Sequence, residues 1–154
     1  MEIEFGYVKD YTKKGFGFLS RTFRNSQGRV WFHIKKVKRK YPELAKSIDS
    51  GSYSEIKFWY EIEKVNGRNQ ASQVWLDSRD IPQSERDKLV NYVEKKWSNI
   101  SSKSMPEWLD QVTIDLLGQA RRDELFKNRS LMIGILEKLA LPDPGCSGYT
   151  KLHL

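Results

Sequence analysis

The sequence predicts an α+β protein in which a five-stranded antiparallel sheet is followed by a small all-helical region. Up to residue 77, short runs of alternating apolar residues are separated by turn-forming Gly, Asn and Asp, which is typical of strands joined by tight turns. Beyond Pro82, apolar residues recur every three or four positions, as on one face of a helix. We therefore expect a strand-rich domain at 1–77, a helical region at 78–145 and a flexible tail at 146–154.

The first three strands are expected at residues 3–9, 15–21 and 29–34. The second and third are joined at residues 25–28, Asn-Ser-Gln-Gly, because Asn and Gly tolerate the left-handed backbone of a tight hairpin. Alternate side chains of a strand face the same way. Phe16 and Phe18 therefore share one face of the second strand, and Trp31 and His33 share one face of the third.

A long connection separates these strands from the last two. Residues 35–40 hold five basic side chains in six positions, and residues 42–48 favour one or two helical turns with Pro in the first turn. The fourth and fifth strands are expected at 56–65 and 70–76, joined by the strong hairpin signal Asn66-Gly67.

Three helices are expected in the C-terminal half. The first opens at Pro82, the second begins after Ser104, and the third runs from about residue 123 to residue 139. Their apolar stripes suit packing rather than chemistry. The charge is also uneven, because residues 1–77 hold 15 Lys or Arg and 9 Asp or Glu, whereas residues 78–154 hold 12 and 11.

Two neighbouring strands that carry rings at alternate positions form a surface on which unpaired bases stack. We call the side chains of Phe16, Phe18, Trp31 and His33 the aromatic face. The alternative is that the rings fill a core, as aromatic residues of half-buried strands often do. The occurrence of both motifs in a basic segment favours a binding face.

Residues 6–76 resemble a cold-shock domain. Four motifs in the family's order carry the resemblance: Gly-Tyr-Val-Lys at 6–9, Lys-Gly-Phe-Gly-Phe-Leu at 14–19, Val-Trp-Phe-His at 30–33 and Gly-Arg-Asn-Gln-Ala at 67–71. The resemblance implies a small five-stranded barrel of the oligonucleotide-binding type that binds single-stranded RNA or DNA. It further suggests an RNA chaperone or a transcription-linked regulator.

The family often has an aromatic pair after Val-Lys, where this chain has Asp10 and Tyr11. The resemblance then implies that one stacking position is lost, that a negative charge lies near the phosphate path, and that Tyr11 partly compensates. The basic run at 35–40 follows the third strand, so its cations would lie beside a bound backbone, although a solvated charge run is the alternative. The expected nucleic-acid-binding residues are Lys9, Tyr11, Lys14, Phe16, Phe18, Trp31, His33, Lys35, Lys36, Lys38, Arg39 and Lys40.

Other classes of protein are disfavoured. One cysteine and two histidines argue against a disulfide framework or a Cys/His zinc site. The sequence has neither a phosphate-binding glycine loop nor a Gly-x-Ser-x-Gly motif, so we expect no enzyme and no cofactor. No apolar run reaches the roughly 18 residues of a membrane span, and no secretory signal opens the chain, so a cytoplasmic protein is expected.

A second function stays open on the sequence alone. The helical half is an adaptor or dimerisation module in this alternative, with the barrel as a scaffold and Asp10 a sign of lost nucleic-acid binding. Its partner would be a second copy or another protein. No residue type here distinguishes RNA from DNA.

Overall fold

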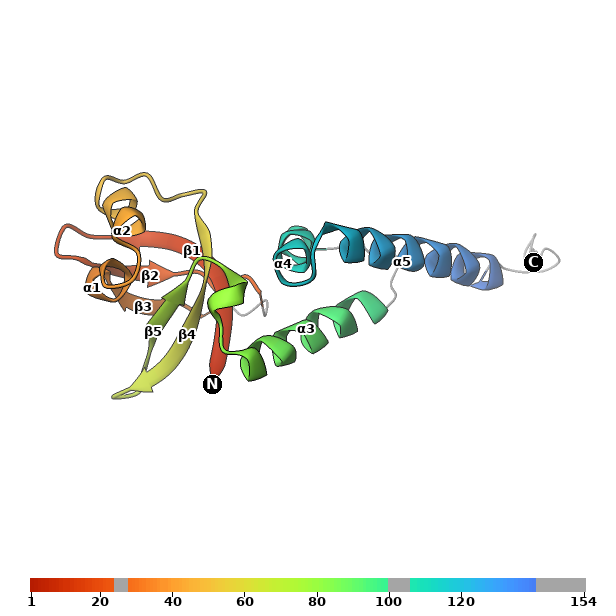
Figure 1. The fold of residues 1–154 in the computed structure, drawn as a ribbon, viewed down its shortest axis with the longest axis horizontal. Coiled ribbons are helices and arrows are strands. Elements are labelled where there is room, and N and C mark those ends of the chain that lie inside the picture. The colour runs from red at the N-terminus through yellow and green to blue at the C-terminus, as the bar shows by residue number, and fades with distance from the viewer. Residues whose placement is uncertain (24–27, 100–105, 141–154) are drawn as a thin grey trace, which may run out of the picture. The chain divides into compact units, whose positions relative to one another are not determined.

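The computed structural model describes residues 1–23, 28–99 and 106–140, and the chain divides into two compact units, Met1–Arg86 and Asp87–Leu154. The first unit holds five strands and two short helices, and the described part of the second is helical (Figure 1). The protein is therefore α+β, as the sequence predicts. Three expected features lie outside the described residues: the turn at 25–27, the cap at Ser104 and the tail at 146–154.

The five strands close into a ring in the order β1-β2-β3-β5-β4. They are β1 (Glu2–Tyr11), β2 (Phe16–Leu19), β3 (Val30–His33), β4 (Lys57–Val65) and β5 (Arg68–Trp75). The prediction of an antiparallel sheet is wrong in one place, because β3 and β5 run parallel and the sheet is mixed. The reason is topological: strand direction cannot alternate all the way around a ring with an odd number of members.

The ring interior is packed with apolar side chains that alternate along the strands. Phe58, Tyr60 and Ile62 of β4 point inward, as their spacing predicts, and they meet Leu19 and Phe32 from β2 and β3. The one hydroxyl among these five side chains is satisfied, because Tyr60 donates a hydrogen bond of 2.5 Å to the backbone oxygen of Ser20. Burial raises the pKa of Tyr60 well above its usual range.

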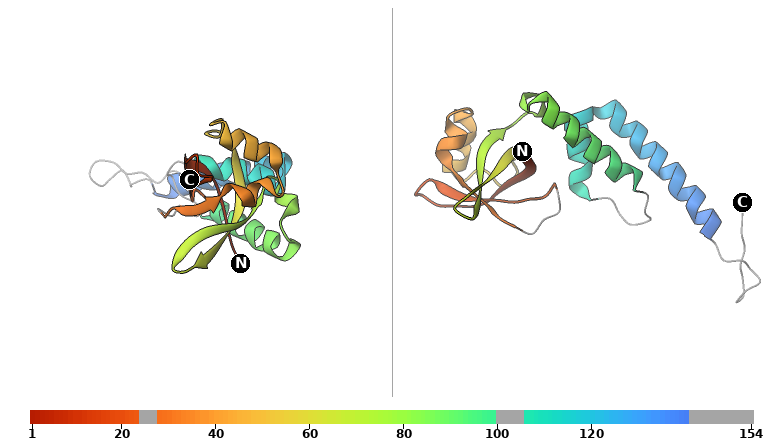
Figure 2. Two further views of the ribbon diagram at one scale, coloured as in Figure 1. Left: turned by 90° about the vertical axis from the view of Figure 1, so that its left-hand side faces the viewer. Right: turned by 90° about the horizontal axis from the view of Figure 1, so that it is seen from below.

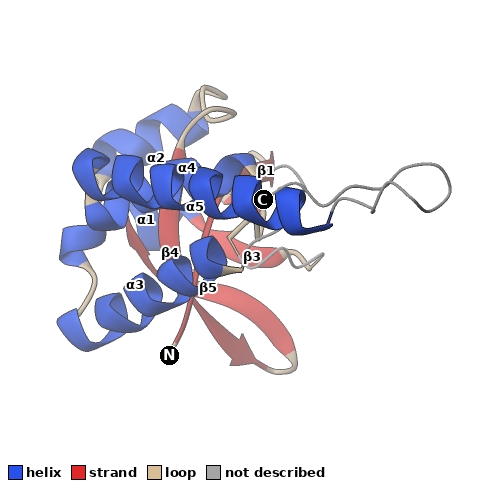
Figure 3. Ribbon diagram, turned by 90° about the vertical axis from the view of Figure 1, so that its right-hand side faces the viewer, coloured by secondary structure: helices blue, strands red, loops and turns tan. Residues whose placement is uncertain are grey.

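Two short helices complete this core in the connection between β3 and β4. They are α1 (Ile34–Lys38) and α2 (Pro42–Asp49), and they lie side by side (Figures 1 and 3). α2 begins at Pro42, as predicted, whereas the basic run at 35–40 was not expected to form a helix. Its one apolar residue, Val37, is fully buried in the core, and its cations point to solvent.

A second aromatic cluster covers the outer surface of β1 and β4. Phe5 and Trp59 face each other across the two strands, with ring centroids 4.8 Å apart, and Phe23 packs edge-on against Trp59 at 5.3 Å. All three are almost completely buried. This aromatic cluster is therefore closed to solvent.

Three helices follow: α3 (Gln83–Ser98), α4 (Glu107–Leu117) and α5 (Gln119–Ala140). The second unit begins at Asp87, so it contains most of α3 and all of α4 and α5. A short 3-10 turn, η1 (Ser78–Asp80), precedes α3 within the first unit. Trp97 ties α3 to α4, because its buried Nε1–H donates to Thr113 Oγ1 at 2.8 Å. Within the described ranges, no helix has the length and hydropathy that a membrane span requires.

The close approach of β1 and β2 at Gly17 gives a stability prediction. We expect Gly17→Ala to lower the free energy of unfolding by about 1–3 kcal/mol or more, because a Cβ there would lie 2.0 Å from the backbone oxygen of Asp10. Urea unfolding followed by circular dichroism measures the change. Gly134→Ala on α5 is the control, since a Cβ there meets nothing within 4 Å, and it should leave stability equal or slightly raised. Wild-type stability of Gly17→Ala would contradict the close approach of β1 and β2.

Candidate nucleic-acid interface

The register of β2 and β3 places the four members of the aromatic face together. Phe16 lies opposite His33, and Phe18 lies opposite Trp31, all on the outer surface of the ring. The ring of Trp31 lies 6.1 Å from those of Phe16 and His33, measured between centroids. All four side chains are half-buried, whereas their neighbours Leu19 and Phe32 point inward and are fully buried.

Two arginines lie over this face, and the sequence did not single them out. The guanidinium carbon of Arg29 is 4.8 Å from the centre of the Phe18 ring, and that of Arg68 is 4.2 Å from the centre of the Trp31 ring. Both distances suit cation–π contacts. Arg29 shares the alternation of Trp31, so its position was readable from the sequence. Arg68 directly follows the β4–β5 turn. It reaches Trp31 only because the five strands close into a ring.

Asp10 lies on the same surface, so its negative charge is on the side of the ring of strands that carries the aromatic face. It is paired across the sheet with Phe18, and its carboxylate accepts a hydrogen bond of 3.2 Å from Arg29. Both partners are mostly exposed, so the pair contributes little to stability. Its main effect is that Asp10 neutralises the charge of Arg29, which otherwise faces outward.

Tyr11 does not join the aromatic face, which corrects the prediction. A bulge between Val8 and Asp10 shifts the register of β1 by one residue, so that Asp10 faces outward and Tyr11 lies opposite Gly17 on the inner side. The Tyr11 ring stacks on Phe32 at 6.0 Å. Without the bulge, regular alternation from the buried Val8 would have turned Tyr11 outward.

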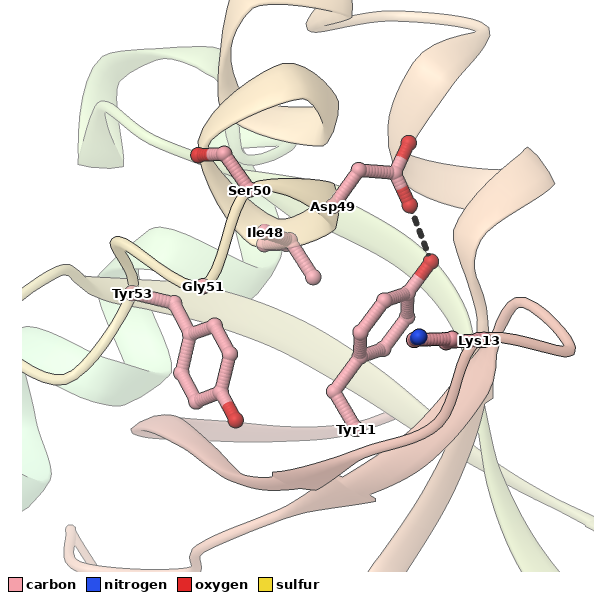
Figure 4. Close-up of a pocket in the computed structure, with 7 residues that line it drawn as sticks. All are labelled: Tyr11, Lys13, Ile48, Asp49, Ser50, Gly51 and Tyr53. Atoms are coloured by element: carbon pink, nitrogen blue, oxygen red, sulfur yellow. Dashed lines mark hydrogen bonds between the residues drawn. The ribbon is translucent and has the colours of Figure 1, made fainter.

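Tyr11 instead lines a pocket of about 450 Å³ beside α2 (Figure 4). Its hydroxyl donates a short hydrogen bond to Asp49, and Tyr53 packs edge-on against its ring. Burial, followed by the hydrogen bond to Asp49 and the charge of Asp49, raises the pKa of Tyr11 to about 12. The pocket is lined by Tyr11, Lys13, Ile48, Asp49, Ser50, Gly51 and Tyr53.

The predicted basic residues surround the aromatic face to different degrees. Lys14 is exposed in the tight turn that precedes Phe16, and Lys9 is exposed at the bulge of β1. The cations at 35, 36, 38 and 39 are exposed on or next to α1, which begins at Ile34, directly after His33. Lys40 differs, because its ammonium lies 5.6 and 5.7 Å from the ring centres of Tyr41 and Trp75, outside the aromatic face.

His33 links the aromatic face to α1. Its Nδ1 accepts a hydrogen bond of 3.1 Å from the backbone N–H of Lys35 and so caps the first turn of the helix. The strand that carries the rings therefore ends where the basic helix begins.

The part of the chain that the structure describes contains no group of three or more His, Cys, Asp or Glu side chains able to hold a metal ion. Comparisons with family models, with curated proteins and with solved structures gave no significant match to this chain.

The Tyr11–Asp49 contact predicts a pH dependence of stability. A tyrosine in the unfolded chain loses its proton near pH 10, whereas native Tyr11 keeps it to about pH 12. Its contribution to stability is therefore complete below pH 10 and is lost as the pH rises to 12. In urea unfolding across this interval, Tyr11→Phe should show a shallower decline than the wild type. Tyr53→Phe is the control, since Tyr11 supplies the hydrogen bond to Asp49. Equal slopes for all three proteins would contradict the assignment.

Proposed function

We propose that the first unit binds single-stranded RNA or DNA by stacking bases on the aromatic face. The observation that carries this proposal is the cross-strand group of four half-exposed rings, two of which lie under guanidinium groups. Each stacked base contributes about 1–3 kcal/mol, and stacking tolerates any sequence because every base has a flat face.

The positions of the loops support the same proposal. In oligonucleotide-binding barrels, ligands occupy the surface of strands 2 and 3 and the loops between strands 1 and 2 and between strands 4 and 5. Here the rings lie on β2 and β3, Lys14 lies between β1 and β2, and Arg68 lies directly after the β4–β5 turn. We therefore assign the ring of strands to this barrel type, in line with the cold-shock resemblance, as part of the proposal.

The cations give the proposed binding its salt dependence. Phosphates would pair with Lys9, Lys14 and the exposed basic residues that begin at Lys35. Neutralising several phosphates releases counterions, so the affinity should fall steeply as the salt concentration rises. Low sequence specificity combined with stacking suits a protein that keeps transcripts unpaired, such as an RNA chaperone.

Replacement of single rings tests the proposal. Phe18→Ala and Phe16→Ala are each expected to weaken binding of a labelled oligouridine or oligothymidine about five-fold to hundred-fold, because one stacked base is lost. Fluorescence anisotropy at low salt measures the affinity, and circular dichroism checks the fold. Phe126→Ala on α5 is the control, since that ring is 42% exposed in the other unit. Absence of wild-type binding at low salt, or unchanged affinity in both ring variants, would contradict the proposal.

Asp10 predicts a gain of affinity. Asp10→Asn removes a negative charge opposite Phe18 and releases Arg29 for phosphate, so binding should strengthen about two-fold to five-fold at low salt. The gain should shrink as salt is added. Glu43→Gln is the matched control, because it breaks the exposed pair with Lys46 on α2 and changes the net charge equally. An equal gain in both variants would mean that net charge, and not the position of Asp10, sets the affinity.

A further inference from the structure

α5 carries a contiguous apolar surface near its C-terminal end. Five large apolar side chains, four aliphatic and one Met, remain 44–58% exposed. We call this set the α5 apolar face; its members are Leu131, Met132, Ile135, Leu136 and Leu139. Isolated exposed apolar residues are common on protein surfaces, but a contiguous patch of this kind marks an interaction site.

The five residues lie on one side of the helix. At about 100° per residue, positions 131, 135, 139, 132 and 136 fall within an arc of about 140°. Phe126, which is also exposed, falls about 150° from the centre of that arc. The α5 apolar face is thus confined to one side of the helix, and hydrophobic residues are not spread evenly around it.

The α5 apolar face continues a surface that begins beside the end of α3. Trp97 and Ser98, at the end of α3, line a pocket of about 280 Å³ together with α5 residues from Leu125 to Met132. α5 runs on beyond that level, past the end of α3 (Figure 2). The α5 apolar face therefore continues about two turns beyond Met132, the last α5 residue that lines this pocket.

We propose that the α5 apolar face pairs with the same face of a second copy of the chain. The area supports this occupant. Five residues of this size, about half exposed, offer on the order of 500 Å² per copy, so two copies that cover them fully would bury roughly 1,000 Å², the lower bound for a specific interface. An interface related by a two-fold axis uses the same patch on both subunits.

The charge pattern also favours a second copy over a charged partner. Residues 131–136 read Leu-Met-Ile-Gly-Ile-Leu and contain no charged side chain. An acidic or basic partner segment would find no counter-charge at the centre of this face, whereas an identical apolar face loses nothing on burial. Pairing would also place two nucleic-acid-binding units in one assembly, which raises the affinity for long single strands by avidity.

Sedimentation velocity of the full chain tests the pairing. Between about 1 and 100 µM, we expect the mass to rise from 18.1 kDa toward twice that value. Ile135→Gln/Leu139→Gln should raise the dissociation constant at least about ten-fold, because Gln keeps the helix propensity and removes the apolar contact. Phe126→Gln is the matched control on the same helix, outside the arc, and should dimerise like the wild type.

Amide hydrogen exchange supplies the second measurement. Residues 131–139 should gain protection as the wild-type concentration rises, and the double variant should show no such gain. A wild-type chain that stays monomeric at about 100 µM would overturn the proposal, and so would protection that is independent of concentration, because the face would then be covered by its own chain. Dimerisation of the double variant equal to that of the wild type would also overturn it. None of these results depends on nucleic-acid binding.

Discussion

Closure of an odd number of strands is the constraint on which the proposed interface depends. Four of the five strand pairs in the ring are antiparallel, so the last pair, β3 with β5, has to be parallel. Parallel pairing brings the beginning of β5, and not its end, beside Trp31. The residue that follows the β4–β5 turn, Arg68, consequently lies over the indole ring.

The outer surface of the ring of strands has a buried part and a half-exposed part. On β1 and β4, Phe5, Phe23 and Trp59 pack together and are almost completely buried. On β2 and β3, the rings stay half-buried, and two long arginine side chains lie over Phe18 and Trp31. Guanidinium groups are planar and weakly hydrated, so they exchange readily between a ring, a base and a phosphate. Under the proposed function, a bound base would insert among existing stacking partners, and Asp10 would compete with phosphate for one of them.

Much of the fold follows from local patterns in the sequence. The alternation of Phe16 with Phe18 and of Trp31 with His33 predicts that these residues share a face, and the turn residues Asn66-Gly67 predict the β4–β5 hairpin. The change to helical spacing after Pro82 predicts the helices of the second unit.

The features that the sequence did not predict depend on more than one strand. The bulge next to Lys9 exchanges the sides of Asp10 and Tyr11, and no residue type at that point signals it. The place of Arg68 depends on ring closure, which is a property of the whole sheet. The basic run at 35–40 shows no helical apolar pattern, although most of it lies in α1. One buried residue, Val37, is enough to anchor so short a helix.

The cap at the start of α1 has a consequence for the chemistry of His33. Because Nδ1 accepts the hydrogen bond from Lys35, the neutral imidazole carries its proton on Nε2. The ring is thereby held in one tautomer and one orientation, with an N–H donor at its far edge. Under the proposed function, His33 would therefore donate a directional hydrogen bond to a base carbonyl or a phosphate oxygen, in addition to offering a flat surface.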